Sequence, residues 1–254
     1  WELIDPTSGS NPRISTGNLH TPRWNHRALY VQKGLKAQRD AVYVVGGENN
    51  DSTVDTIEFF DAVMLEQIPP TLTLPRGGKT LPTVSFNAKR GFVFVAGGFT
   101  DKSKSQASKD VELFAIDGNS EPLGLTPIHQ DTHKLDLLVA RGGHEAVMLS
   151  NQDVLFVGGM RNDGDGARVA VREGEVLTEL VRIEETPAGQ SMSITPIRTS
   201  VDNLLPLGVA FPATCVLESG NALILGGVAN NAGHMESTQQ AVIYAFDDTT
   251  KVVQ

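Results

Sequence analysis

Three arginines and two histidines are the side chains of this sequence best placed to do chemistry. Arg23, Arg76 and Arg141 each belong to a short basic or glycine-rich segment that recurs along the chain, and His26 and His144 follow the first and third by three residues. If these segments are equivalent units of a repeat, symmetry places the arginines in a ring. Converging guanidinium groups suit a carboxylate, a sulfate or an acidic side chain. We therefore predict these five residues as a ligand-binding set.

Each of these residues also has a structural interpretation. An arginine that is part of a repeat consensus can tie its own unit to a neighbour through backbone carbonyls or an acidic side chain. A histidine at a repeated position can pack and form hydrogen bonds, although His26 and His144 also offer metal-binding nitrogens. Both interpretations stay open at the level of the sequence.

Other patterns that could hold a metal are incomplete. His129 and His133 have the spacing of a zinc pair on a helix, but their segment is predicted to be a loop and lacks the glutamate of a metalloprotease motif. The acidic loop at 162–166 fails the EF-hand pattern, because Arg161 and Arg172 occupy positions that need acids. We interpret that loop as a tight turn, with a looser calcium site as the alternative. We predict no metal and no cofactor.

Nucleophilic catalysis has little support in the sequence. No Gly-x-Ser-x-Gly elbow is present. The single cysteine, Cys215, lies in an apolar strand segment, where we expect a buried and inert thiol. We predict no catalytic residue.

The elements that must position these residues are marked by a phrase that occurs four times, an apolar strand followed by two glycines. The copies are residues 41–47, 91–98, 153–159 and 222–227. Repetition at intervals of 51, 61 and 68 residues (Gly46 to Gly97, Gly158 and Gly226) indicates an array of like units. Adjacent residues without Cβ let the chain turn sharply at a strand end and let neighbouring units approach. We interpret the glycines as structural, since no phosphate-binding pattern follows them.

Each unit has the same predicted order of elements. A lead-in, the basic or glycine-rich segment that begins at Arg23, Arg76, Arg141 or Leu207, opens each unit. An apolar strand, a short polar turn and the diglycine strand follow it, and together they predict a β-hairpin. A polar loop and a third strand follow, at 56–61, 110–117 and 241–247, with a degenerate third copy near 167–176. A fourth strand is weaker, as at 71–74, and a hidden degenerate blade around 179–200 is an alternative. Four antiparallel strands in about 50 residues are typical of a propeller blade.

The diglycine units resemble the kelch repeat, which carries a diglycine after its second strand and packs into β-propellers. Phe60, Phe114 and Tyr244 are the counterparts of the family's tyrosine, and no tryptophan follows them. The Arg-x-x-His-x-Ala lead-in is more similar to divergent repeats of bacterial secreted proteins and of the galactose-oxidase propeller. The resemblance implies an all-β, kelch-like β-propeller of four-stranded antiparallel blades, with at least four blades. It also implies an extracellular or cell-surface location, with a cytoplasmic one as the alternative.

The repeat divides one predicted domain, residues 1–254, into four blades. We place them at 22–74, 75–138, 139–205 and 206–254, with 1–21 as outer strands of a preceding or closing blade. Outer strands are then supplied both by 1–21 and by the last blade, so the two ends of the chain do not complete one blade. The chain is therefore part of a larger propeller, is completed by a second chain, or closes with four blades. It begins at Trp1 without an initiator Met or a signal segment, which fits a mature product, an excised domain or a stretch of a longer protein.

Composition argues against some classes of binding partner. The net charge of −9, with scattered lysine and arginine, argues against a nucleic-acid partner. No apolar run has the length of a transmembrane helix, so we expect no membrane insertion.

These observations predict a non-enzymatic binding or scaffold module that presents propeller-face loops to a protein or a glycan. The expected recognition loops are 48–55, 99–109, 118–138, 160–166 and 228–240. One alternative is a structural component of a larger extracellular or appendage assembly. Another is a glycan-active enzyme with a site at the channel mouth.

Overall fold

The computed structural model of the chain describes residues 2–5, 13–34, 37, 39–62, 66–117, 124–128, 135–163, 168–171, 178–185, 192–197, 208–231 and 234–245. Within these ranges the regular elements are all β-strands, and the sheets are antiparallel. The expected all-β class is therefore confirmed. The described strands do not form a closed barrel or propeller.

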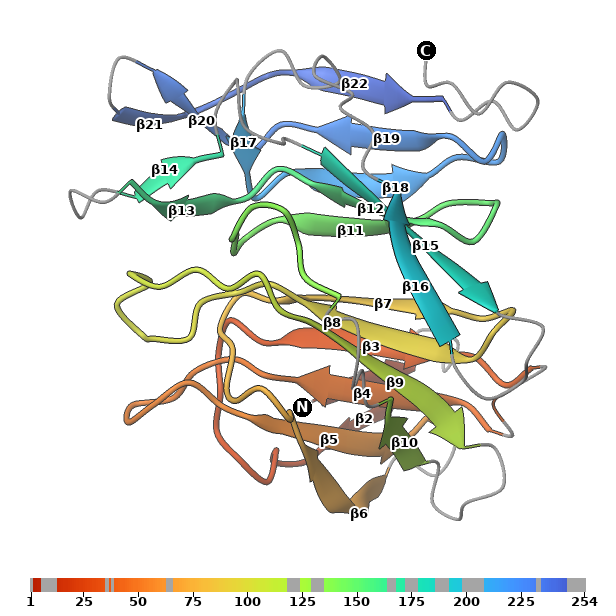
Figure 1. The fold of residues 1–254 in the computed structure, drawn as a ribbon. Helices are drawn as coiled ribbons and strands as arrows, with labels where there is room; N and C mark the ends of the chain where they lie inside the picture. Colours follow the sequence, from red (N-terminus) through yellow and green to blue (C-terminus); the bar gives the residue numbers. More distant parts are fainter. Residues whose placement is uncertain are drawn as a thin grey trace.

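Four sheets make up the body of the molecule, and they follow one another along the chain (Figure 1). The first sheet has the order β3 (Arg27–Val31), β4 (Ala41–Val45), β5 (Thr56–Asp61) and β6 (Glu66–Thr73). The second has β7 (Thr83–Asn87), β8 (Phe92–Ala96), β9 (Val111–Asp117) and β10 (Gly124–Pro127). The third has β11 (Glu145–Met148), β12 (Val154–Val157), β15 (Thr178–Glu185) and β16 (Met192–Ile197). The fourth has β18 (Ala213–Val216), β19 (Ala222–Leu225) and β22 (Ala241–Tyr244).

Smaller sheets stand beside these four. They are β1 (Glu2–Asp5) with β2 (Arg13–Thr16), β13 (Met160–Asn162) with β14 (Arg168–Ala170), and β17 (Val209–Ala210) with β20 (Val228–Asn231) and β21 (His234–Ser237).

Three local predictions for the third and fourth units are wrong. The third strand of the third sheet is β15, not a degenerate strand near 167–176, because residues 168–170 pair with β13 in a separate hairpin. No additional unit begins at 179, since β15 and β16 are the outer strands of the third sheet. The segments 160–162, 228–231 and 234–237, predicted as loops, are strands.

The sheets share one register. The residue two positions before each diglycine pairs with a set position on the third strand: Val44 with Glu58, Val95 with Glu112, Phe156 with Glu179, and Ile224 with Val242. The first strands of successive sheets are neighbours, with β7 between β3 and β11, and β11 beside β18. Side chains alternate between the two faces of a strand, so each sheet has one face toward the sheet before it and one toward the sheet after it. We call these the back face and the forward face.

The hydrophobic core lies in the three joints between successive sheets. The first joint packs Tyr43 and Val45 of the first sheet with Val93 and Phe114 of the second. The other two joints repeat this packing; they contain Phe94, Leu113 and Phe156, and then Leu155, Leu180 and Ile224. The central strands β4, β8 and β12 are buried on both faces, which explains their continuous apolar runs.

Candidate functional site

One end of the four sheets carries a repeated backbone arrangement that builds a hollow. The residue after each diglycine pairs with a lead-in residue: Glu48 with Trp24, Phe99 with Thr80, Met160 with Gly142, and Val228 with Ala210. The next lead-in residue has positive φ in each unit: Asn25 (54°), Leu81 (53°), Gly143 (62°) and Phe211 (53°). A left-handed conformation is costly for leucine and phenylalanine, so its recurrence indicates that the surrounding structure imposes it.

These four residues are joined in a chain of hydrogen bonds. Leu81 N–H donates to Asn25 O (3.0 Å), Gly143 N–H to Leu81 O (3.1 Å), and Phe211 N–H to Gly143 O (2.7 Å). Gly143 is the one position of the four without a side chain, and a Cβ there would lie 2.6 Å from the Phe211 ring. The glycine therefore leaves the space into which Phe211 packs.

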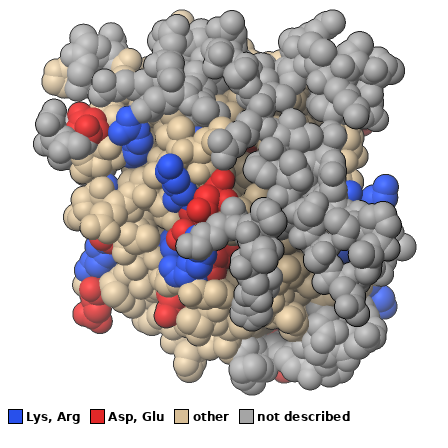
Figure 2. Space-filling model, in the orientation of Figure 1, with Lys and Arg blue, Asp and Glu red and all other residues tan. Residues whose placement is uncertain are grey.

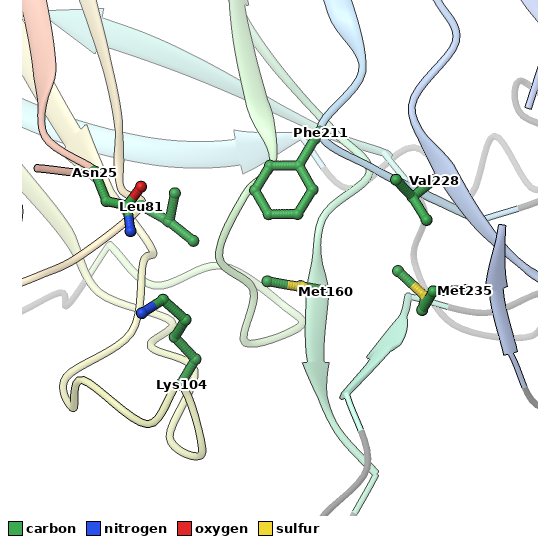
Figure 3. A pocket seen from close by; sticks show the side chains of 7 residues that line it. All are labelled: Asn25, Leu81, Lys104, Met160, Phe211, Val228 and Met235. Carbon is green, nitrogen blue, oxygen red and sulfur yellow. The ribbon is translucent and has the colours of Figure 1, made fainter. Parts of the chain in front are cut away.

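A hollow of about 500 Å³ opens at this end of the sheets (Figure 3). Its lining residues are Asn25, Leu81, Lys104, Met160, Phe211, Val228 and Met235. Five of these seven side chains are apolar, and none is acidic. Figure 3 shows Phe211 and Met160 between Leu81 on one side and Val228 and Met235 on the other.

The two polar residues of the lining, Asn25 and Lys104, both donate hydrogen bonds to a buried carboxylate, Glu48. Glu48 accepts hydrogen bonds from Asn25 Nδ2 (2.7 Å) and from Lys104 Nζ at both carboxylate oxygens (2.8 and 2.9 Å). Lys104 Nζ also donates to Lys102 O (2.9 Å), which engages all three ammonium protons. The lysine is therefore paired with Glu48 and its donors are all engaged, whereas Oδ1 of the other polar lining residue, Asn25, has no hydrogen-bond partner among the described residues.

Sequence reasoning missed this hollow, although it named the segments that build it. Lys104 comes from the predicted recognition segment 99–109, Met160 from 160–166, and Val228 and Met235 from 228–240. Aligning the residue that follows each diglycine would have collected Glu48, Phe99, Met160 and Val228 as one set. That alignment was available in the sequence.

Arg23 and Arg141 lie inside the fold in matching environments. Arg23 Nη1 donates to Gly46 O (2.8 Å), and Arg141 Nη1 to Gly158 O (2.6 Å). Each arginine pairs with a glutamate of the third strand in its own sheet, Arg23 with Glu58 (2.5 Å) and Arg141 with Glu179 (2.8 Å). Neither arginine side chain is exposed. These contacts support the structural interpretation, and ligand binding by the two arginines stays a prediction.

The buried glutamates also cap backbone donors. Glu58 accepts from the N–H groups of His20 (2.8 Å) and Thr21 (3.0 Å), and Glu179 from Leu138 (2.6 Å) and Val139 (3.2 Å). Burial lowers the pKa of Arg23, while the Glu58 carboxylate opposes that shift.

Arg76 is not the counterpart of Arg23 and Arg141, contrary to the sequence prediction. That position belongs to Lys79, which directly precedes the paired residue Thr80 as Arg23 precedes Trp24. Arg76 lies three residues earlier and binds Asp110 (3.0 Å) and Asp136 (2.8 Å) at the partly exposed margin of the second sheet. Spacing from the diglycine misplaced it because the basic segment 76–79 contains two candidates.

Lys79 does not reproduce the arginine–glutamate contact. Its Nζ donates to Asp110 Oδ2 (2.8 Å) and to Arg76 O (2.9 Å). Glu112, at the position of Glu58 and Glu179, accepts a hydrogen bond from Arg76 N–H (3.2 Å), and its Oε1 has no partner among the described residues. Burial is the main cause that raises the pKa of Glu112 to about 7.

The two predicted histidines lie one residue after the positive-φ position, where the second and fourth units have Pro82 and Pro212. His144 is fully buried, and its Nε2 lies 2.9 Å from Thr83 Oγ1. Burial, followed by the charge of Arg141, holds the pKa of His144 well below its usual range. Burial also lowers the pKa of His26. The two rings belong to different units, and ligand binding by them stays a prediction.

Other sequence candidates are placed as follows. Cys215 is exposed, so the expectation of a buried thiol is wrong; the side chain lies on the forward face of the fourth sheet, which nothing covers among the described residues. His129, His133, Arg172 and residues 164–166 of the acidic loop lie outside the described residues. Within the described part of the chain, no group of three or more His, Cys, Asp or Glu side chains is arranged to hold a metal ion.

Charge on the surface is mixed. On the face shown in Figure 2, basic and acidic side chains lie next to one another among the coloured residues. The described residues contain no helix long and apolar enough to cross a membrane. No protein-family model matches the sequence, and no curated protein matches it at a significant level.

Proposed function

We propose that this chain is a non-enzymatic binding module on a kelch-like β-propeller scaffold, and that it binds a protein partner by taking an apolar side chain into the hollow. Each of the four sheets would be one blade. The lead-in segments and the residues after each diglycine would form the binding face. The observation that carries this proposal is the apolar lining of the hollow, rimmed by a single side-chain acceptor at Asn25.

The bonding of Lys104 supports an uncharged ligand group. Because its ammonium protons already bind Glu48 and Lys102, a carboxylate in the hollow would find no free donor there. Methionine side chains adapt to apolar groups of different shape, and Met160 and Met235 both line the hollow. A leucine-, methionine- or phenylalanine-like side chain therefore fits best, with its backbone N–H directed to Asn25 Oδ1.

A glycan is the less favoured ligand. Sugar hydroxyls buried against Leu81, Met160, Phe211 and Val228 would lose water without gaining hydrogen bonds, which costs free energy for each group. An enzyme acting on glycans would need carboxylates facing the substrate, and none of the seven lining side chains is acidic. Protein binding therefore accounts for the lining better than either alternative.

The test uses a random peptide library displayed on phage, panned against the immobilised chain, with a printed glycan array in parallel. A selected peptide is then titrated by calorimetry against the wild type and Phe211→Asn. Asparagine tolerates positive φ, so this variant removes the apolar wall without straining the backbone. Val216→Asn, an exposed substitution away from the hollow, is the matched control.

We expect apolar-containing peptides whose affinity falls roughly tenfold or more in Phe211→Asn, as the loss of a buried aromatic contact predicts. The control should bind as the wild type does. Equal affinity for Phe211→Asn would exclude the hollow as the site, and binders found only on the glycan array would overturn the choice of a protein partner.

A further inference from the structure

The forward face of the fourth sheet is apolar and open to solvent. Its pairing puts one set of side chains on a single face, namely Ala213, Leu225 and Ala241 in one row and Cys215, Leu223 and Ile243 in the next. Leu225 is 41% exposed and Ile243 is 56% exposed. Large apolar side chains clustered on one exposed sheet face mark an interaction surface.

The same positions are buried in the other three sheets. The counterparts of Leu225, which directly precede the diglycines, are Val45, Ala96 and Val157, and none is more than 2% exposed. The counterparts of Ile243 are Phe59, Leu113 and Leu180, with exposures of 6%, 3% and 3%. The fourth sheet thus has the residue pattern of a joint, and no sheet among the described residues covers it.

In each of the three joints, the cover is the back face of the following sheet. Leu29 on the forward face of β3 packs with Val84 and Phe86 on the back face of β7. Leu155 on the forward face of β12 packs in the same way with Ile224 on the back face of β19. The partner that fits the open face is therefore another back face of this repeat.

A backbone hydrogen bond across each joint indicates the same contact. The N–H of the second glycine donates to the next lead-in in every joint: Gly47 to Lys79 O (2.7 Å), Gly98 to Arg141 O (2.8 Å), and Gly159 to Val209 O (2.7 Å). Gly227 has the same conformation, with φ of 103° against 98°, 90° and 104°. Its N–H has no hydrogen-bond acceptor among the described residues.

The back face of the first sheet is open along its first strand, β3, while Val44, Glu58 and Phe60 on the same face are buried. Its strand β3 carries Ala28 and Tyr30 at the positions of Val84 and Phe86, and Tyr30 is 55% exposed. We propose that the forward face of the fourth sheet binds the back face of β3 in a second copy of this chain, by the joint geometry used between sheets within the chain. The contact is head to tail, so it builds either a ring or a filament.

The first measurement is the molar mass of the purified chain by light scattering over a wide concentration range. We expect the mass to rise from 27.3 kDa with concentration. Ile243→Glu, which puts a charge into the apolar joint, should weaken association roughly tenfold or more. Phe211→Asn serves as the control, since it alters the hollow and leaves the joint intact. It should associate like the wild type, which separates this proposal from that of the binding hollow.

The second measurement tests the register through Cys215, which is the only cysteine of the chain. In the proposed joint Cys215 takes the place of Leu29 and faces Ala28 and Tyr30 of the second copy. Tyr30→Cys should therefore form disulfide-linked multimers under mild oxidation, and the double variant Tyr30→Cys with Cys215→Ser should not. A wild type that stays at 27.3 kDa throughout, or wild-type dimers linked through Cys215 of both copies, would overturn the proposal.

Discussion

Arg141 and Glu179 are joined at 2.8 Å in the interior of the third unit, and the two corresponding positions of the fourth unit are both valine. Arg23 and Glu58 repeat the pair in the first unit. The cation and the acid are therefore present together or absent together in these three units. A buried ion pair and a pair of apolar side chains are both satisfied solutions, whereas one charge alone is not.

This relationship predicts an asymmetry between single and double substitutions. Arg141→Val leaves the Glu179 carboxylate buried without its cation and should lower the free energy of unfolding by roughly 3–5 kcal/mol. Arg141→Val combined with Glu179→Val copies the fourth unit and should cost less than Arg141→Val alone. Some loss should remain, because the N–H groups of Leu138 and Val139 lose their acceptor. Urea unfolding of Arg141→Val, Glu179→Val and the double variant measures the coupling, and additive effects would contradict it.

The raised pKa of Glu112 predicts that the folded protein loses stability as the pH rises. Its pKa in the folded protein, about 7, lies above the ordinary value of 4.5, so the fold favours the protonated acid. That stabilisation is complete below pH 4.5 and is lost as the pH rises through 7; the shift corresponds to roughly 3 kcal/mol.

Glu112→Gln keeps the shape of the side chain and does not titrate. The difference in unfolding free energy between the wild type and Glu112→Gln should therefore change between pH 5 and pH 8, in favour of the variant at the higher pH. Chemical unfolding at intervals across this range measures it. A difference that does not vary with pH would show that Glu112 is ionised throughout.

The lowered pKa of His144 predicts the opposite trend, a loss of stability as the pH falls into the acidic range. Its pKa is held well below 6.5 by burial, so the folded state keeps the neutral ring. The stability that this group contributes is present above pH 6.5 and is lost as the pH falls toward its lowered pKa. The ring proton resonances of His144, followed by NMR, should show no titration near pH 6.5. A midpoint at or above 6.5 would contradict the burial described here.

Replacing a glycine of the diglycine by alanine is expected to destabilise the folded protein strongly. A Cβ at Gly158 would lie 2.2 Å from Val209 O, and the residue has a φ of 65°. Gly158→Ala should therefore lower the free energy of unfolding by roughly 2 kcal/mol or more, through backbone strain and a shifted joint.

Gly34 is the matched control, since its Cβ would meet nothing closer than 3.8 Å. Gly34→Ala should change stability by less than about 0.5 kcal/mol. Thermal and urea unfolding of both variants make the comparison. Equal effects at the two positions would remove the structural role that we assign to the diglycine.

The fold class was predictable because its signals are local. Period-two strands, polar turns and paired glycines each reflect the conformation of a few neighbouring residues, and four copies made the pattern unambiguous. The third unit was the exception. Its third strand, β15, follows the β13–β14 hairpin, and local alternation cannot say which of two strands pairs with β12.

The candidate site was less predictable, since its parts meet across sheets. Sequence patterns named Arg23, His26, Arg141 and His144, yet their burial depends on which neighbour covers them. Lys79 and Arg76 are two basic residues in one short segment, and the pairing of Thr80 with Phe99 is what distinguishes them. The hollow needs Leu81, Phe211 and Met160 from three units, a combination that spacing within one unit does not contain.

The repeat and the all-β class could be predicted from the sequence, because they follow from the geometry of a few neighbouring residues. Three features became visible only in the folded chain: Cys215 is exposed, Lys104 pairs with Glu48, and the forward face of the fourth sheet is not covered by any described residue. The physical reason is that exposure and pairing are properties of two surfaces that meet. A pattern within one strand defines only one of them.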